Sequence, residues 1–510
     1  MGMFLLILVL FFSLGTATLV SADTEKRSIS TLEDLTGLKA GVMTGTPQDS
    51  IVQGAVKDAE LLYFDNFTDL LLALREKKID FYINSTVSYE MIKEQYSDFA
   101  IVSDVVKTFG VGTIFPKNEK GEALKAQLDE FIAKITENGT LKDLQDYWLT
   151  AGEKQNINIP QSGSNGVLRM ATSTSAKPFS YLLNNQNVGF DVALLALFCE
   201  EYDYGLSIQD MNFAAVLTGL GTGKYDLGAG QISYTEERAE SVLYSDFYYT
   251  QELVAIIRAE DSAASASEDT DSSEESFWSK LKAGFNKSFI RENRWQLILS
   301  GLGTTMIITL GGFVLANILG ALFCAMSLSK VRALNVIAEI YSWIMQGTPM
   351  VVVLMILYYV IFGHSSISGL AVSVIGFGVA FGAYMAQTFY GAITSIPKGQ
   401  VEAALSLGFT KRRTFLGIIF PQAVRRMLPG YVSQLISLMK GTAVVGYVAV
   451  VDLTKVGDII RSNTYEAFFP LIAVALIYLL VASLLLLGLK LIQKKLAHKI
   501  TANNDKEAAA

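Results

Sequence analysis

The stretch EAALSLG, residues 402–408, lies between two long apolar runs of the sequence, 368–394 and 427–451. These residues can form a short helix that lies along a membrane face. The small side chains of Ala403 and Ala404 would let a partner pack closely, and Gly408 would end the helix. Taken by itself, the stretch would also fit an ordinary amphipathic loop between two helices.

The second half of the chain holds apolar runs that are typical of a membrane protein. A helix needs about 20 apolar residues to cross a bilayer. The sequence is 51% hydrophobic and 18% charged, whereas soluble domains carry about a quarter of charged residues. We therefore expect an all-α polytopic membrane domain of about five helices within residues 295–495. The runs are 296–327, 335–362, 368–394, 427–451 and 467–492.

Basic residues follow the first, third and fifth runs, for example at Lys330, Lys411 and Lys494. Because positively charged loops stay in the cytoplasm, these positions share one side if the N-terminal part lies outside. This orientation leaves a cytoplasmic tail at 496–510. A further basic stretch falls on the opposite side and departs from the rule, so we interpret 277–294 as an interfacial segment.

The chain begins with an apolar segment, 3–19, that is followed by Val20, Ser21 and Ala22. Small residues at the last and third-last positions are typical of a signal-peptidase site. Because positively charged residues are missing ahead of the apolar segment, 1–22 also fits an uncleaved N-terminal anchor. Both interpretations place the residues that follow on the outer side of a cell membrane.

Residues 23–258 alternate short β-rich runs with amphipathic helices, a pattern that is typical of a soluble α/β fold. We expect two α/β stretches, 23–150 and 168–258, joined by a polar connector, 151–167. Residues 259–276 are rich in Ala, Ser, Asp and Glu. Such a composition cannot bury enough apolar surface to fold, so we expect an acidic flexible tether there.

Several kinds of site find no support in the sequence. Cys199 and Cys324 lie far apart in apolar stretches, which argues against a disulfide and against a metal site. His364 and His498 are isolated and have neither ligand spacing nor triad spacing. No basic stripe is interleaved with aromatic residues, so nucleic acid is not an expected partner. No nucleophile–base pair emerges either, and we do not expect an enzyme.

One stretch is similar in composition to a phosphate-binding loop. GLGTGKY, residues 219–225, has glycines and a lysine, but a phosphate loop needs G-x(4)-G-K followed by Ser or Thr. Here the spacing is shorter, and Tyr225 stands in place of the hydroxyl residue that holds magnesium. We interpret the stretch as a helix end that turns into a strand.

The membrane half resembles the permease subunits of ABC importers for polar amino acids, of the histidine and glutamine type. The resemblance covers nearly all of residues 290–495, and its motifs follow one another in the family's order. The motifs are G-T-P at 347–349, A-Y at 383–384, S-I-P-K-G-Q at 395–400, the E-A-A loop at 402–408, I-I-F-P at 418–421 and K-G-T at 440–442.

The sequence departs from the family's pattern at a few positions. Gln346 replaces the usual Arg before G-T-P, Gln387 replaces a Glu, and Gly441 replaces an Asp. Ala443 replaces a Ser, and Phe420 replaces a Leu. The first three bear on the translocation path and leave the docking loop intact.

The resemblance implies that the E-A-A loop docks on a cytoplasmic ABC ATPase subunit, which holds ATP and Mg²⁺, and transmits its movement. One set of five spans is too few to line a pathway, so a second permease chain is expected. It would be an identical chain, or a related permease in a heterodimer. No cofactor or metal is expected in this chain. The implied coupling residues are Glu402, Ala403, Ala404 and Gly408, and the candidates for the translocation path are Thr348, Pro349, Lys440 and Thr442.

The outer half resembles the family 3-type extracellular amino-acid-binding proteins, whose type II fold has two α/β lobes. Residues 168–258 resemble lobe one, for example in ISYTEER at 232–238, and residues 30–150 resemble lobe two with the closing helices. This order is the reverse of the family's, so we infer a circular permutation that still builds one bilobed domain. The alternative is a truncated tandem of two half-domains. One crossover between the lobes is expected at 111–117.

The resemblance also places a ligand pocket. Arg238 corresponds to the arginine that binds the ligand's α-carboxylate through a bidentate contact, which suits a planar guanidinium. Ser233 corresponds to a hydroxyl residue that helps it, Phe213 to an aromatic wall, and Thr46 to a residue of lobe two that closes on the carboxylate. Alternatively, Arg238 is a surface ion-pair residue and Phe213 belongs to a core.

The pocket has fewer groups that suit the ligand's ammonium than groups that suit its carboxylate. The family's acid in lobe two falls at Ser85, beside Asn84; a second polar or acidic position falls at Ser173, and a stacking aromatic falls at Ala176. An ammonium group in a closed pocket needs an anion or several acceptors. We expect an amino acid as the solute, polar or cystine-like. The alternative is an outer domain that acts as a degenerate sensor or assembly module.

Overall fold

We describe the protein from a computed structural model. The structure describes residues 28–263 and 277–508, except 45, 66, 94, 95, 364, 366 and 467. The expected N-terminal signal or anchor at 1–22 and most of the expected tether lie outside the described residues, as does His364.

Lobe two is built on a five-stranded sheet in the order β2-β1-β3-β13-β4. β1 pairs in parallel with β2 and β3, whereas β13 runs antiparallel to β3 and β4. Fully buried side chains such as Val42, Phe81 and Ile83 form its core. The elements are η1 (Glu33–Leu35), β1 (Lys39–Met43), α2 (Gln48–Ala55), β2 (Glu60–Phe64), α3 (Phe67–Arg75), β3 (Phe81–Ser85), α4 (Thr86–Ile92), β4 (Phe99–Val111) and β13 (Tyr249–Arg258).

Lobe one is built on a second five-stranded sheet, in the order β10-β6-β11-β5-β12. A small sheet, β7-β8-β9, lies beside it. The strands are β5 (Ile114–Pro116), β6 (Val167–Thr172), β7 (Ser175–Ala176), β8 (Ser180–Leu183), β9 (Gln186–Val188), β10 (Gly205–Asp210), β11 (Leu227–Gly228) and β12 (Val242–Tyr244). The helices are α5 (Glu119–Glu137), α6 (Thr140–Trp148), α7 (Phe190–Glu201), α8 (Phe213–Gly221) and α9 (Glu236–Ser241).

The two sheets have the same topology. In each sheet, the fourth strand comes from the half of the sequence that builds most of the other lobe. β13 follows β12 in the chain but completes the sheet of lobe two, and β5 follows β4 but completes the sheet of lobe one. The chain therefore crosses between the lobes twice, at 111–114, as expected, and again at 244–249. The predicted boundaries missed the second crossing, because residues 168–258 were assigned whole to lobe one.

The joint that a permutation would have cut is still closed in space. The Ile29 amide donates to the Asp261 carbonyl oxygen at 2.7 Å, and the Ala263 amide donates to the Ile29 carbonyl oxygen at 3.0 Å. Residues 259–263, expected to open the tether, are thus held against lobe two. A strand exchange in both directions makes the two halves one bilobed domain in permuted order, not a tandem of two half-domains.

The described residues of the membrane half form helices and the loops between them, with no strand. The elements are α10 (Phe277–Phe285), η4 (Asn286–Ile290), η5 (Arg291–Asn293), α11 (Trp295–Ser327), α12 (Arg332–Gly347), α13 (Met350–Met355), η6 (Ile356–Ile361), α14 (Gly369–Thr394), α15 (Lys398–Ser406), α16 (Lys411–Thr414), η7 (Phe415–Ile419), α17 (Phe420–Gly441), η8 (Thr442–Val448), α18 (Leu453–Thr464) and α19 (Phe468–Ala508).

Three of the described helices are long and apolar enough to cross a membrane: α11, α14 and the first part of α19, 468–488. A fourth crossing results if α12 and the 350–361 helix, bent by 107°, count as one span. The fourth expected span, 427–451, is not among these spans. Its apolar residues are divided between α17 and the short η8, and α17 also carries Arg425, Arg426 and Lys440.

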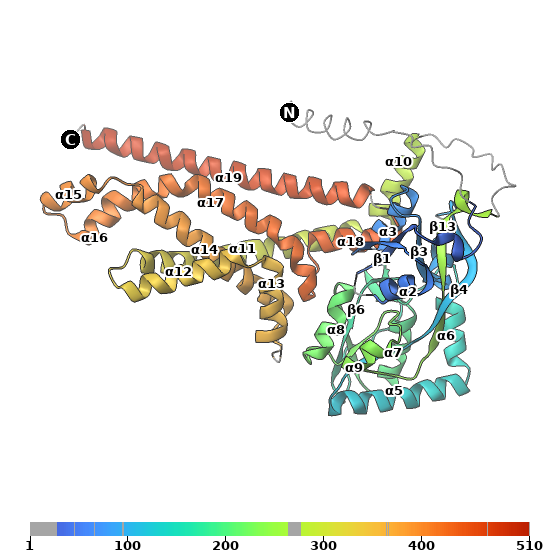
Figure 1. The fold of residues 1–510 in the computed structure, drawn as a ribbon. Coiled ribbons are helices and arrows are strands. Elements are labelled where there is room, and N and C mark those ends of the chain that lie inside the picture. Colours follow the sequence, from blue (N-terminus) through green and yellow to red (C-terminus); the bar gives the residue numbers. More distant parts are fainter. Residues whose placement is uncertain are drawn as a thin grey trace.

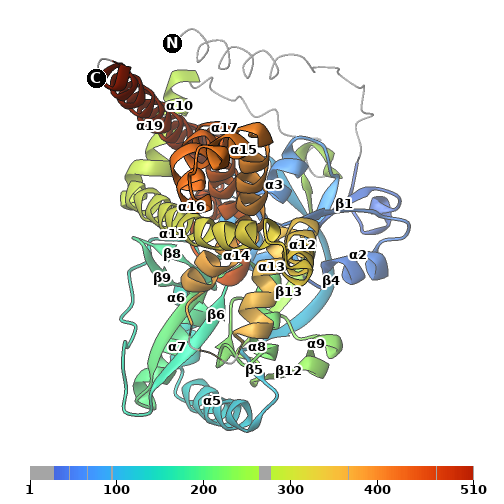
Figure 2. The same cartoon turned by 90° about the vertical axis from the view of Figure 1, so that its left-hand side faces the viewer.

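α11 and α14 form the centre of the bundle because glycines let them approach closely. A Cβ atom at Gly320 would lie 2.4 Å from the Met385 side chain, and one at Gly378 would lie 2.5 Å from Leu315. The binding domain and the loop that contains α15 and α16 lie at opposite ends of the bundle (Figure 1). Figure 2 looks along the bundle from the α15–α16 end.

The first prediction concerns the closing helix α6, which comes from the first half of the sequence. Trp148 at its end is 2% exposed and packs edge-on against Tyr181 of lobe one, with ring centroids 6.4 Å apart. Trp148→Ala should cost about 3–5 kcal/mol of unfolding free energy, since it leaves a large cavity. Calorimetric unfolding of the full chain in detergent measures this loss.

The neighbouring Tyr147, 42% exposed, supplies a matched control. Tyr147→Ala should lower the unfolding temperature much less than Trp148→Ala. Equal effects of the two substitutions would contradict the packing of α6 as a core element of lobe one.

Candidate functional site

A cleft of about 120 Å³ lies between the two lobes, where the sequence predicts a ligand pocket. Four of the six predicted ligand residues line it: Thr46 from lobe two, and Phe213, Ser233 and Arg238 from lobe one. The strand exchange explains this meeting, since both crossings run beside the cleft. Further polar residues line it as well, among them Asn84, Gln231 and Gln251.

Arg238 is held in place by its own helix and by the loop before it. The Thr235 hydroxyl caps α9 by accepting from the Arg238 amide at 3.2 Å. The Arg238 side chain is 9% exposed, its Nη1 donates to the Ser233 carbonyl oxygen at 3.1 Å, and its Cζ lies 5.7 Å from the centre of the Phe213 ring. Arg238 is therefore a nearly buried residue that lines the cleft. Its fork of donors suits a carboxylate.

A chain of hydrogen bonds connects the two lobes across the cleft. Gln231 Nε2 donates to Ser85 Oγ and to Gln251 Oε1, both at 3.0 Å, and Gln251 Nε2 donates to Ser233 Oγ at 2.6 Å. Ser85 belongs to lobe two, whereas Gln251 lies on the crossing strand β13. Sequence reasoning missed both glutamines. The only signal was Gln251 as a polar residue two places ahead of the apolar run of β13, 253–257.

The two remaining predicted residues lie behind the cleft wall. Ser85 is fully buried, and Ser173 is 3% exposed, with its hydroxyl 2.7 Å from that of Ser175. Neither residue lines the cleft, although Ser175 and Ala176 do. None of the described residues that line the cleft is a carboxylate, whereas Arg238 and Lys177 are cationic. Only neutral acceptors are therefore at hand for an ammonium group.

Asp191, on the first turn of α7, holds the loop that carries Gln231. Its Oδ2 accepts from the Gly230 amide at 2.7 Å and from the Gln231 amide at 2.9 Å. Burial of this carboxyl raises its pKa to about 6, although the two amides act in the opposite sense. Asp191 therefore links the shape of the cleft to pH.

The binding domain contacts the membrane half mainly through α18, which reaches both lobes. Lys455 Nζ lies 3.4 Å from Asp210 Oδ2 and donates to Asn212 Oδ1 at 3.3 Å, both in lobe one. Arg461 forms an ion pair with Asp69 of lobe two. Just beyond α18, the Tyr465 carbonyl oxygen accepts from Tyr96 Oη at 2.8 Å.

The stretch 219–225 adds a second contact with the membrane half. α8 ends at Gly221 and β11 begins at Leu227, so the stretch is the helix end that the sequence predicts. Lys224 Nζ donates to the carbonyl oxygens of Phe362 and Ile367, at 3.3 and 3.2 Å.

The EAALSLG stretch supplies the second half of the helix α15, 402–406, and the residues that end it, at the far end of the bundle (Figure 1). Gly408 has φ +83°, and its amide donates to the Leu405 carbonyl oxygen at 3.0 Å, so it ends the helix as expected. Glu402 and Ala403 are exposed, whereas Ala404 is 2% exposed and packs inside the loop. Leu407 is 78% exposed and offers an apolar contact that the sequence analysis did not include.

Comparisons with known proteins agree with this arrangement. Residues 317–498 match the family model described as the binding-protein-dependent transport system inner membrane component. The "Probable amino-acid ABC transporter permease protein YckA" of Bacillus subtilis is 32% identical over 220 residues, which are 42% of this chain and 96% of that protein. The chain belongs to the amino-acid ABC transporter permeases.

A second relative of this permease is the histidine/lysine/arginine/ornithine transport system permease protein HisQ of Escherichia coli. It is 31% identical over 195 residues, which are 36% of this chain and 86% of that protein. The relatives are transport subunits and not enzymes.

Two solved structures are similar to part of this chain. One, described as an amino acid ABC transporter with histidines, is 28% identical and covers 44% of this chain and 100% of its own, with a TM-score of 0.38. Another is the probable amino-acid ABC transporter extracellular-binding protein ytmK of Bacillus subtilis. It is 10% identical and covers 45% of this chain and 86% of its own, with a TM-score of 0.25.

The candidates for the permease's translocation path lie at two breaks between helices. Thr348 and Pro349 stand at the bend between α12 and α13. Lys440 is exposed near the end of α17, and Thr442 is buried at the start of η8. A Cβ atom at the neighbouring Gly441 would lie 3.1 Å from the Phe377 ring, so the family's Asp would be crowded there.

Two departures from the family's pattern meet in space. Gln387 Nε2 on α14 donates to Gln346 Oε1 on α12 at 3.0 Å. A neutral amide pair therefore stands at the two positions where the resemblance implies Arg and Glu. The two amides bond to each other, and neither position carries a charge.

The pH prediction concerns Asp191, whose pKa rises from 3.8 to about 6 on folding. The folded chain then holds a proton more tightly than the unfolded chain. The stability from this group is full below pH 3.8 and is lost as the pH rises through 6, a cost on the order of 3 kcal/mol. The unfolding temperature of Asp191→Asn should therefore fall less steeply than that of the wild type across this window. Identical slopes would contradict the assignment.

A further prediction concerns the amide pair of Gln346 on α12 and Gln387 on α14. Gln346→Arg and Gln387→Glu, made singly, should each lower the unfolding temperature in detergent, because each introduces an unpaired charge between helices. The double variant should recover part of the loss, with a coupling free energy of about 1 kcal/mol or more. Losses that simply add would show that the two side chains do not interact.

Proposed function

We propose that the chain is the permease subunit of an ATP-driven amino-acid importer with its own fused extracellular solute-binding domain. The observation that carries this proposal is the contact of both lobes with α18, because it connects the cleft directly to the membrane bundle. The solute would be a polar or cystine-like amino acid, held at its carboxylate by Arg238 and Ser233.

The proposed mechanism is alternating access, driven by closure of the lobes on the solute and by a cytoplasmic ABC ATPase. The lobes close on the solute, and α18 passes this closure to α11, on which it packs. A Cβ atom at Gly301 of α11 would lie 2.7 Å from Val456, and Thr305 Oγ1 accepts from the Leu453 amide at 3.1 Å. At the far end, Glu402, Ala403 and Gly408 would dock on a cytoplasmic ABC ATPase that binds ATP and Mg²⁺.

Assembly and orientation follow the same proposal. Two permease chains, identical or related, would line one pathway in the cell membrane. The binding domain would lie outside the cell, and the C-terminal part of α19 would lie in the cytoplasm. The basic residues near α15 and α16 support this orientation, since cytoplasmic loops are rich in Lys and Arg.

The alternative, a sensor or assembly module that no longer captures solute, rests on the described residues that line the cleft, none of which is a carboxylate. The relatives described above are permeases and lend it no support. Neutral acceptors such as Asn84 and Gln251 can still bind an ammonium group, although more weakly than an anion would.

Solute binding is the test of this proposal. The full chain in nanodiscs is titrated by calorimetry with each proteinogenic amino acid and with cystine. We expect at least one of them to bind, and Arg238→Ala to weaken that binding about a hundredfold, because the carboxylate loses its charged partner. Lys117→Ala, a cation of lobe one outside the cleft, should leave the affinity unchanged.

A folded chain that binds none of these solutes would exclude solute capture and favour the sensor or assembly role. A solute whose affinity survives Arg238→Ala would contradict the carboxylate site.

A further inference from the structure

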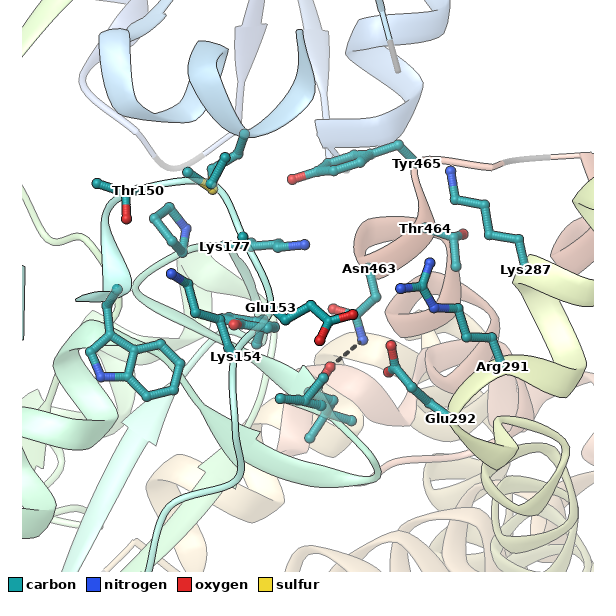
Figure 3. A pocket seen from close by; sticks show the side chains of 18 of the residues that line it. Thr150, Glu153, Lys154, Lys177, Lys287, Arg291, Glu292, Asn463, Thr464 and Tyr465 are labelled. Atoms are coloured by element: carbon teal, nitrogen blue, oxygen red, sulfur yellow. Dashed lines mark hydrogen bonds between the residues drawn. The ribbon is translucent and has the colours of Figure 1, made fainter. Parts of the chain in front are cut away.

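A second, larger cavity lies where the binding domain meets the membrane half. Its volume is about 780 Å³. Its walls come from lobe one, from the connector at 150–154, from the interfacial segment 287–294 and from the end of α18, with a contribution from α4 of lobe two. The labelled side chains of these segments point toward a common space (Figure 3).

Positive charge exceeds negative charge in this cavity. Its basic residues are Lys154, Lys177, Lys287, Arg291 and Arg294, and its acidic residues are Glu90, Glu153 and Glu292. Two of the three acids already have partners. Glu292 pairs with Arg294 at 2.9 Å, and Glu90 pairs with Lys93 on its own helix. Among the described residues, neither Lys177 nor Arg291 has an ion pair within 4.0 Å.

We propose that this cavity binds an anionic phosphate group, supplied by a lipid headgroup or by free phosphate. The basic residues converge there from segments that are far apart in the sequence, so a phosphate would join the binding domain to the membrane half. Charge-assisted contacts of Arg and Lys with phosphate are among the strong hydrogen bonds of proteins.

The electrostatics of the cavity fit such a ligand. Burial, together with the nearby Arg294 and Arg291, lowers the pKa of the Lys177 amine. Burial and the cations around it likewise lower the pKa of Lys287. These cations repel one another in a partly desolvated space, and an anion among them would relieve the repulsion.

The position of the cavity brings lipid phosphates within reach. Three of its cations belong to the segment directly before α11, whose first residue, Trp295, is 45% exposed. Tryptophan at the end of a spanning helix is typical of the membrane–water interface. The proposal thus explains the basic stretch 280–294, which departs from the charge pattern of the other loops.

The test uses the full chain in a neutral detergent, with unfolding temperature as the readout. The probes are sodium phosphate, dihexanoyl phosphatidylglycerol and, as zwitterionic comparison, dihexanoyl phosphatidylcholine. Ligands that bind the folded state raise the unfolding temperature, and the rise grows with the logarithm of the ligand concentration relative to Kd. We expect phosphate or phosphatidylglycerol to stabilise the chain, with affinity about tenfold weaker in the Arg291→Gln, Lys177→Gln double variant.

Lys282→Gln is the matched control, since Lys282 lies in the same basic stretch, is exposed and does not line the cavity. Its affinity for the probes should equal that of the wild type. If phosphate stabilises the chain at least as much as phosphatidylglycerol does, the site binds a free anion. If only phosphatidylglycerol stabilises the chain, the site binds a lipid headgroup.

The proposal is overturned if neither probe stabilises the wild type beyond phosphatidylcholine, or if Lys282→Gln weakens binding as much as the double variant. If the double variant does not fold, the single variant Arg291→Gln replaces it, since this side chain is exposed. Native mass spectrometry of the wild type then counts the bound phosphatidylglycerol.

Discussion

The contact of one helix, α18, with both lobes of the binding domain is the constraint on which the account depends. Lys455 faces Asp210 of lobe one, and Arg461 pairs with Asp69 of lobe two. Both basic side chains are nearly buried, and a buried charge is costly unless its partner stays in place. The two ion pairs therefore favour one separation of the lobes, so a change in that separation at the cleft must either move α18 or break a pair.

Strand exchange makes this arrangement possible in a chain whose lobes appear in permuted order. β5 and β13 each leave one half of the sequence to complete the sheet of the other half. The cleft lies beside these crossings, so Gln251 on β13 can bond both to Ser233 and to Gln231. The hydrogen bonds at Ile29 keep the start of lobe two beside the end of β13.

The sequence predicts those features that depend on local pattern or on a motif, and misses those that depend on pairing across the chain. Arg238, Phe213 and Thr46 belong to motifs and do line the cleft, and Gly408 ends its helix because only a local φ is required. Ser85 and Ser173 lie behind the wall of the cleft. The sequence does not indicate whether a side chain lines the cleft or lies one residue deeper. The second crossing and the Gln346–Gln387 bond join residues that are far apart, so no local pattern indicates them. The expected run 427–451 is divided between α17 and η8, and apolar content alone does not indicate this break.

The most direct test of the central claim is a charge-reversal cycle at Asp69 and Arg461, read out as solute uptake by cells that express the complete transporter. Asp69→Arg and Arg461→Asp each place like charges together, so each should lower uptake while solute binding to the chain persists. The double variant restores an opposite pair and should recover a substantial part of the uptake. Uptake that is unchanged in both single variants, or losses that simply add in the double variant, would contradict transmission of lobe closure through α18.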